Sequence, residues 1–262
     1  RQLYYETSEN GIDWSDDMPL AAIPEKPGEK SGHYQVSARS KTNKLGTFFN
    51  RHPNGNVDQR TDLYYLQTTD HGKTWTSVDQ QPIPIPLIEK NSPALVKNYA
   101  ELKKNIYLKD MIFDPNGYPI CLYIRSNGHR PGPLSQPYEW CVTRWNGKKW
   151  ITQNVTQSDH NYDMGSLLYT QGELYLMAPT AIGPQKWGVG GEIQLWKYAT
   201  HGKNWIKEND ITTHSLRSHS YVRRSENFQS PFVFFWANGD SHHFSQSELF
   251  FGDLKGQVWQ LP

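Results

Sequence analysis

The apolar residues of this chain alternate with polar ones over short stretches, and no stretch shows the spacing of an amphipathic helix. Tyr118 to Ser126 and Tyr138 to Trp145 are typical. Such stretches end at turn-forming residues, for example Asp114-Pro115-Asn116-Gly117 and Gln171-Gly172. Alternation with a period of two, interrupted by Gly, Pro, Asn and Asp, is the pattern of β-strands. The sequence therefore predicts an all-β protein.

A Gly-x-x-Trp motif recurs along the chain. It stands at Gly11–Trp14, Gly72–Trp75, Gly147–Trp150, Gly202–Trp205 and Gly256–Trp259. A strand-like stretch generally precedes the Gly, and a shorter one follows the Trp. We interpret each copy as a hairpin in which Gly supplies a positive φ and Trp packs back beneath the turn.

A second pair of strand-like segments lies upstream of four of these hairpins. The pairs are 33–40 with 45–51, 106–113 with 118–126, 161–169 with 173–178, and 219–225 with 232–237. Four antiparallel strands per unit, with no helix between units, are typical of a β-propeller blade, whereas a sandwich would need closer and more even strands. The first hairpin has only Arg1 to Tyr5 before it. We therefore predict about four and a half blades, with residues 1–262 forming a single β-propeller domain or the carboxy-terminal portion of one.

The charge balance limits the range of partners. Lys and Arg total 27 and Asp and Glu 26, which gives a net charge of +1. Binding of a polyanion through overall charge is therefore excluded, and we expect no nucleic-acid role. Because apolar runs are too short to cross a bilayer, we also expect no membrane partner. An anionic ligand would need a local basic site.

The two cysteines, Cys121 and Cys141, both lie in strand-like segments. The simplest interpretation is two buried free thiols. A disulfide stays open as an alternative, as does a zinc site completed by His129 or His160, because thiolate and imidazole both suit zinc.

The segment Thr68 to Trp75 fits the Asp-box pattern, Ser/Thr-x-Asp-x-Gly-x-Thr-Trp, and Thr7 to Trp14 is a degenerate copy. These boxes resemble those of sialidases and other BNR-repeat propellers, where they are structural turns away from the active site. The resemblance implies that Asp70 stabilises a turn and is not a catalyst.

A closer resemblance is to the BNR-type propellers that include the ulvan lyases and related polysaccharide lyases. It is carried by residues 56–65, 160–165, 190–193, 221–224 and 235–239. It implies part of a seven-bladed propeller, a β-eliminating enzyme, and a chain without the catalytic histidines, which lie on early blades of that family. It also implies that structural calcium or zinc is compatible with the fold, although the chemistry itself needs no cofactor.

The predicted inner strands begin with His, Tyr and cationic residues, and in a propeller such starts meet at the mouth of the central channel. With a turn at Lys41 to Lys44, Tyr34 would lie directly across from Arg51. A guanidinium beside a phenol favours the phenolate, so Tyr34 could move a proton. The family pattern likewise implies Tyr34 as the acid or acid/base and Arg51 as the group that neutralises a uronate carboxylate. Further candidates to hold carboxylate or sulfate groups are His52, Arg60 and Lys109.

The sequence thus favours a polysaccharide lyase, secreted or periplasmic, that cleaves a uronic-acid-containing and ulvan-like anionic polysaccharide. We expect a monomer, or pairing with a missing amino-terminal portion. One alternative is a propeller glycoside hydrolase that uses Asp110 and Asp163, since hydrolysis needs two positioned carboxylates. The other is a non-catalytic sugar-binding propeller.

Overall fold

The computed structural model describes residues 2–199 and 203–262, which form 18 strands in five antiparallel sheets. A two-stranded sheet pairs β1 (Leu3–Tyr5) with β2 (Met18–Ala21). Four sheets have four strands each, and in each the strands are hydrogen-bonded in sequence order. We call these four sheets blades 1 to 4.

Most strand bounds follow the segments predicted from the sequence. Blade 1 contains β3 (Gln35–Arg39), β4 (Leu45–Arg51), β5 (Thr61–Thr68) and β6 (Leu95–Lys97). Blade 2 contains β7 (Asn105–Phe113), β8 (Pro119–Ser126), β9 (Tyr138–Trp145) and β10 (Trp150–Ser158). Blade 3 contains β11 (Ser166–Thr170), β12 (Glu173–Ala181), β13 (Glu192–Ala199) and β14 (Asn204–Asp210). Blade 4 contains β15 (Ser218–Arg224), β16 (Phe234–Gly239), β17 (Leu249–Gly252) and β18 (Val258–Gln260). However, β11 begins five residues after the predicted start at 161, and β6 was not predicted.

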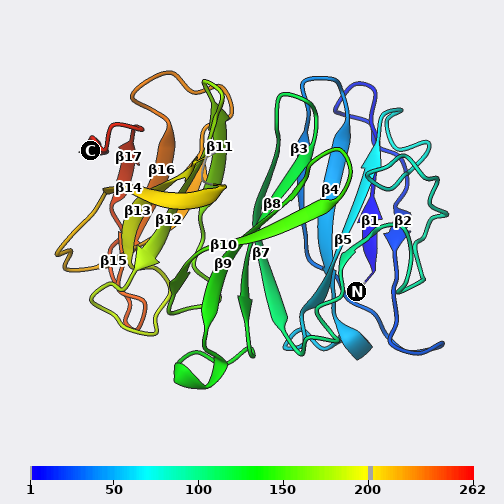
Figure 1. Cartoon of the computed structure of the whole chain (residues 1–262), viewed down its shortest axis with the longest axis horizontal. Coiled ribbons are helices and arrows are strands. Elements are labelled where there is room, and N and C mark those ends of the chain that lie inside the picture. Colours follow the sequence, from blue (N-terminus) through cyan, green and yellow to red (C-terminus); the bar gives the residue numbers. More distant parts are fainter. Residues whose placement is uncertain (1, 200–202) are drawn as a thin grey trace.

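The blades follow one another in sequence order, from the blue two-stranded sheet to the red blade 4 (Figure 1). Their first strands, β3, β7, β11 and β15, contact one another in that order and form the inner edge. An apolar cluster fills each space between neighbouring sheets. Members of the four clusters are Phe49 with Leu20, Phe48 with Tyr123, Trp140 with Leu176, and Met177 with Phe234. This arrangement is that of β-propeller blades, and the predicted all-β propeller is confirmed.

Burial explains which sequences form which strands. The second strand of blade 2, β8, lies between two blades, and its run Ile120 to Ile124 is fully apolar and buried. The outermost strand, β10, alternates polar and half-buried positions because it borders solvent. A strand that is covered on both faces needs a continuous apolar run, and an outer strand needs alternation.

The turn after β5 is held by the carboxylate of Asp70. This side chain accepts hydrogen bonds from the hydroxyl of Thr68 at 2.7 Å and from both the backbone amide and the hydroxyl of Thr74, at 3.0 and 2.6 Å. Hydrogen bonds, above all from Thr74, lower the pKa of Asp70 to about 2. These contacts agree with a turn-stabilising role.

Three of the five predicted hairpins need comment. At Gly11 the predicted positive φ is present, at 74°, but Trp14 is 59% exposed and does not pack beneath the turn. In blade 1 the segment after Trp75 does not form the fourth strand. Thr76 makes only isolated bridges, and β6 comes after a proline-rich loop instead. The predicted hairpin at Gly72 forms, since Thr76 and Gln67 exchange backbone hydrogen bonds at 2.9 Å and Gly72 has a φ of 83°. Prolines at 82, 84 and 86 lack the amide hydrogen that a strand ladder needs, so the prediction that this segment continues as the fourth strand was wrong. The predicted turn at Gly202 lies outside the described residues.

The two cysteines are buried free thiols, so the simplest interpretation is confirmed and the disulfide is not formed. Burial raises the pKa of both thiols. In the described part of the chain no three His, Cys, Asp or Glu side chains gather as a metal site would require. The structural calcium or zinc that the resemblance allows stays a prediction. No helix among the described residues is long and apolar enough to cross a membrane.

Candidate functional site

The starts of the first three inner strands meet at one cavity of about 260 Å³. Tyr34 precedes β3, Tyr107 and Lys109 belong to β7, and Tyr162 and Met164 precede β11. Gln35, Asn50, Arg60 and Leu108 complete the wall. The prediction that polar and aromatic residues converge at the strand starts is confirmed for Tyr34, Tyr107 and Tyr162.

Arg60 lies among the three tyrosines. Its guanidinium carbon is 4.7 Å from the ring centre of Tyr34, 4.6 Å from that of Tyr107 and 5.2 Å from that of Tyr162. It donates to the hydroxyl of Tyr162 at 2.8 Å and to the carbonyl of Val57 at 2.8 Å. Among residues 2–199 and 203–262 no carboxylate forms an ion pair with it. Stacking therefore fixes the cation while its charge stays available to an anion.

The predicted pairing of Tyr34 with Arg51 is wrong by one residue. In β3 and β4, Gln35 lies across from Phe49 and Arg39 across from Leu45. Tyr34 is accordingly matched with Asn50, which donates its backbone amide to the Tyr34 carbonyl at 3.0 Å and accepts the Tyr34 amide on its side chain at 2.9 Å. A shift of one residue moves a side chain to the other face of the sheet.

Arg51 instead belongs to a buried ion network. Its side chain is 2% exposed and donates to Asp62 at 2.8 and 3.0 Å and to Glu25. Lys90 pairs with the other oxygen of Glu25 at 2.9 Å. Because two carboxylates already occupy its guanidinium, Arg51 has no charge left to neutralise a substrate. Breaking such a network would leave buried charges unpaired.

The other two binding candidates differ in access. His52 is 1% exposed, and its ring lies against the ring of Tyr34 at 4.7 Å, edge to face. The His52 ring therefore packs against the Tyr34 ring and does not line the cavity. Lys109 does line it, although its side chain is 4% exposed.

Lys109 is held from two sides. Its side-chain nitrogen is 2.6 Å from the carbonyl oxygen of Asn161 and 3.8 Å from the sulfur of Met164. Burial lowers the pKa of Lys109, the Asp163 carboxylate opposes this shift, and Arg60 and Arg223 add to it. Burial also disfavours the charged form of Asp163 and so raises its pKa; Oδ1 of Asp163 accepts a hydrogen bond from the Gly190 amide at 2.8 Å.

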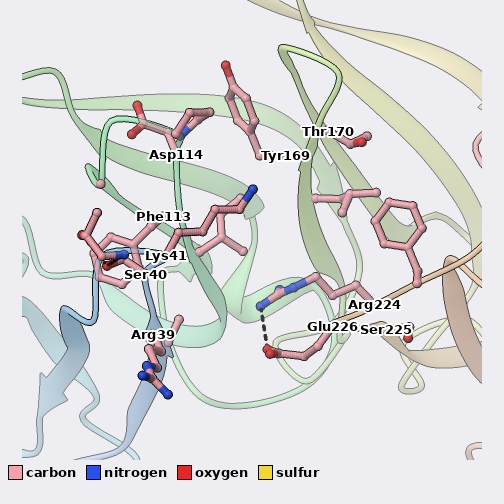
Figure 2. Close-up of a pocket in the computed structure, with 17 residues that line it drawn as sticks. Arg39, Ser40, Lys41, Phe113, Asp114, Tyr169, Thr170, Arg224, Ser225 and Glu226 are labelled. Carbon is pink, nitrogen blue, oxygen red and sulfur yellow. Dashed lines mark hydrogen bonds and ion pairs between the residues drawn. The ribbon is translucent and has the colours of Figure 1, made fainter.

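A second cavity, of about 380 Å³, lies at the opposite ends of the inner strands (Figure 2). Arg39, Lys41, Asp114, Arg224 and Glu226 bring charge to its wall. Arg224 lies near Glu226 at 3.9 Å and forms a closer ion pair with Asp110. This cavity is larger, but the charge of Arg224 in its wall is already neutralised by Asp110. The cavity at Tyr34 is therefore the better candidate for binding an anion.

The two carboxylates of the hydrolase alternative do not form a catalytic pair at the Tyr34 cavity. Asp110 accepts from Arg224 and from the Leu167 amide, and Asp163 is fully buried. Neither lines the cavity. Sequence reasoning did not foresee the roles of Glu25, Asp62 and Met164. No local signal marks Glu25 or Met164, which lie 26 and 55 positions from their partners Arg51 and Lys109. Asp62 lies on β5, the strand paired with that of Arg51, but the strand pattern does not show that its side chain meets the guanidinium.

Comparisons with known proteins agree with this architecture. Residues 4–158, more than half of the chain, match the model of a family described as BNR repeat-containing family member. No curated protein matches.

Among solved structures, an ulvan lyase of polysaccharide lyase family PL25 is similar, with a TM-score of 0.74 and 13% identity. The match covers 96% of this chain and 59% of that one. An ulvan lyase of family PL25 bound to -[GlcA(1-4)Rha3S]- gives a TM-score of 0.75 at 12% identity and the same coverage. The polysaccharide lyase Uly1 gives 0.63 at 12% identity, over 96% of this chain and 53% of that one.

This chain thus spans little more than half the length of the lyases that it resembles, and at such identities the likeness shows the fold alone. The family match covers all of blades 1 and 2, and the cavity residues Tyr34, Arg60 and Lys109 lie within it. The chain belongs to the BNR repeat-containing family.

Proposed function

We propose that the protein is a carbohydrate-active enzyme that cleaves a uronic-acid-containing, ulvan-like polysaccharide by β-elimination. The observation that carries the proposal is Arg60, a cation without a carboxylate partner in the described chain, held by three tyrosine rings at a cavity. Elimination removes the proton at C5 of a uronate, and charge then develops on the adjacent carboxylate. A fixed guanidinium stabilises that charge without losing a proton.

Each tyrosine fits a part of this chemistry. Tyr34 is 40% exposed at the cavity, so its hydroxyl can reach a sugar and protonate the leaving oxygen at C4. Tyr107 is buried, and burial raises its pKa to about 12, so it serves as wall. The solved lyase bound to a glucuronate–sulfated rhamnose unit supports an anionic polysaccharide as substrate. Such polymers lie outside cells, and we therefore place the enzyme in a secreted or periplasmic location.

The test is incubation of the protein with ulvan and with other uronate polymers, followed by ultraviolet absorbance of the conjugated C4=C5 bond. We expect absorbance to grow with ulvan. Saturated products would favour the hydrolase alternative, and binding without cleavage would favour a sugar-binding propeller.

Arg60→Met tests the residue that carries the proposal. We expect kcat/KM to fall by about 10²- to 10³-fold, the usual effect of removing one group that stabilises developing charge. Arg39→Met is the matched control, because Arg39 lies at the opposite end of β3 and lines the other cavity. An equal loss in both variants would contradict the assignment of the site.

A further inference from the structure

Lys109 occupies an unusual place in β7. The ladder between β7 and β8 pairs Leu108 with Tyr123 and Asp110 with Leu122, so Lys109 between them is the extra residue of a β-bulge. Bulges re-aim a side chain, and they concentrate beside active sites. This one directs a lysine into the cavity that already holds Arg60 and Tyr34.

We propose that Lys109, acting as a neutral amine, is the base that removes the C5 proton in the elimination proposed above. The inference rests on that proposed function and assigns it a base that no histidine of the described cavity wall supplies. Lys109 and Arg60 both lie within 6 Å of the ring centre of Tyr107, at 5.8 and 4.6 Å. A base and a carboxylate-binding cation must be neighbours, because C5 is bonded to the carboxyl carbon.

The surroundings favour the neutral amine. The groups acting on the Lys109 charge come from three other segments: Asp163 before β11, Arg60 before β5, and Arg223 on β15. The two arginines and the burial of Lys109 oppose its protonation, and the buried Asp163 favours it. His160, also nearby, is uncharged near neutral pH, because burial lowers its pKa to about 4. Burial of an amine among cations is the usual way in which a lysine becomes a base.

The contacts of the Lys109 side-chain nitrogen leave one position on this atom for an incoming proton. A neutral amine has two hydrogens and one lone pair. The carbonyl of Asn161 and the sulfur of Met164 are acceptors for the two hydrogens. The lone pair is thus free to accept a proton from a sugar in the cavity.

The step balances as a simple elimination. The Lys109 nitrogen takes the proton from C5, and the electron pair of that bond forms the C4=C5 bond. The C4–O bond breaks, its pair stays on the leaving oxygen, and the Tyr34 hydroxyl protonates that oxygen. One proton then passes from the Lys109 ammonium to the Tyr34 phenolate through solvent, which restores both groups.

Lys109→Arg separates a base from a mere cation. Arginine keeps the positive charge but cannot act as a base. We expect kcat to fall at least about 100-fold with ulvan oligosaccharide affinity kept within a few-fold. Lys109→Ala should regain part of the lost kcat when ethylamine is added. Lys44→Arg is the matched control, since Lys44 is also partly buried and donates to a backbone carbonyl, that of Gly117 at 3.0 Å, away from this cavity.

A second measurement needs no turnover. In protein labelled with ¹³C and ¹⁵N in lysine, the Lys109 side-chain resonance should titrate well below the ordinary lysine value of about 10.4. A Lys109→Arg variant as active as the wild type would overturn the inference while the lyase function stands, and so would an ordinary titration midpoint. Absence of unsaturated product from the wild type overturns the proposed function itself, and the inference with it.

Discussion

Tyr34 shows how a single side chain is positioned for chemistry in this cavity. Asn50 fixes its backbone, the His52 ring supports one side of the phenol, and Arg60 stacks on the ring. None of these three contacts uses the hydroxyl, which stays available to a ligand. Removing the hydroxyl should therefore leave the cavity intact and remove only the acid.

For Tyr34→Phe we expect kcat to fall by about 10²- to 10⁴-fold on a uronate polymer, the usual contribution of a general acid, with KM nearly unchanged. Initial rates of ultraviolet absorbance would measure both constants. Tyr162→Phe is the control, because it loses a hydroxyl that bonds Arg60 but keeps Tyr34. If Tyr34→Phe lost no more rate than Tyr162→Phe, Tyr34 would not be the acid.

At the level of single residues, the sequence identified Arg60 and Lys109 as candidate ligands but could not rank them above Arg51. The ranking depends on whether carboxylate side chains neutralise each cation. Arg51 meets Glu25, 26 positions away, and Asp62, whereas Arg60 meets tyrosine rings, one of them 102 positions away. Such pairings depend on tertiary packing, which no local pattern of the sequence encodes.

At the level of elements, one turn accounts for the wrong register of β3 and β4. The sequence indicated a four-residue turn at 41–44. In the structure the Ser40 amide donates to the Lys44 carbonyl at 2.8 Å, so these two residues still pair and the turn has only three residues, 41–43, with Asn43 at a φ of 61°. The Ser40 hydroxyl supports this tighter turn by accepting from the amides of Thr42 and Lys44, and one turn residue fewer shifts every cross-strand pair. The positions of the two strands were thus predictable, but the face of the sheet on which each side chain lies was not.

The connection between blades 3 and 4 depends on Gly191. Its amide and carbonyl exchange hydrogen bonds with His219 at 2.9 and 2.8 Å, and its neighbour Gly190 holds Asp163. A Cβ at Gly191 would lie 2.2 Å from the carbonyl oxygen of Ala181. Since that oxygen belongs to the backbone, the end of β12 and the start of β13 would have to move apart.

We therefore expect Gly191→Ala to lower the free energy of unfolding by about 1–3 kcal/mol, as overpacking usually does, in urea titrations followed by tryptophan fluorescence. Gly239→Ala should change it little, because the nearest atoms to its Cβ would be serine oxygens at 3.5 and 3.6 Å. Equal stability of Gly191→Ala and the wild type would show that the backbone accommodates a Cβ at this position without loss of stability.

Over the whole molecule, the repeating Gly-x-x-Trp hairpins and paired strands were enough to predict four blades and a half-blade. The repeat works because each blade must bury two apolar faces against its neighbours, so every unit carries the same pattern. The number of blades in the full propeller and pairing with an amino-terminal portion stay predictions. The matched solved structures, of which this chain spans 59% at most among the lyases, are compatible with both.

The same blade packing makes stability depend on pH through His33. Its Nε2 accepts from the Ile23 amide at 3.2 Å and its Nδ1 contacts the Asn50 carbonyl at 2.9 Å, so the neutral ring joins the segment after β2 to β4. Burial lowers the pKa of His33 to about 4, below the ordinary value near 6.5. The contribution of this ring is thus complete above pH 6.5 and is lost as pH falls toward 4.

His33→Gln removes that titration. We expect the variant to be less stable than the wild type at pH 7, and the gap to narrow by about 3 kcal/mol as pH falls to about 4.5. Urea unfolding at a series of pH values would measure this gap. His129→Gln is the control, since the His129 side chain is 42% exposed, and at pH 7 this variant should be about as stable as the wild type. A constant gap between His33→Gln and the wild type would mean that His33 keeps its proton affinity on folding, and that its hydrogen bonds to Ile23 and Asn50 do not select the neutral ring.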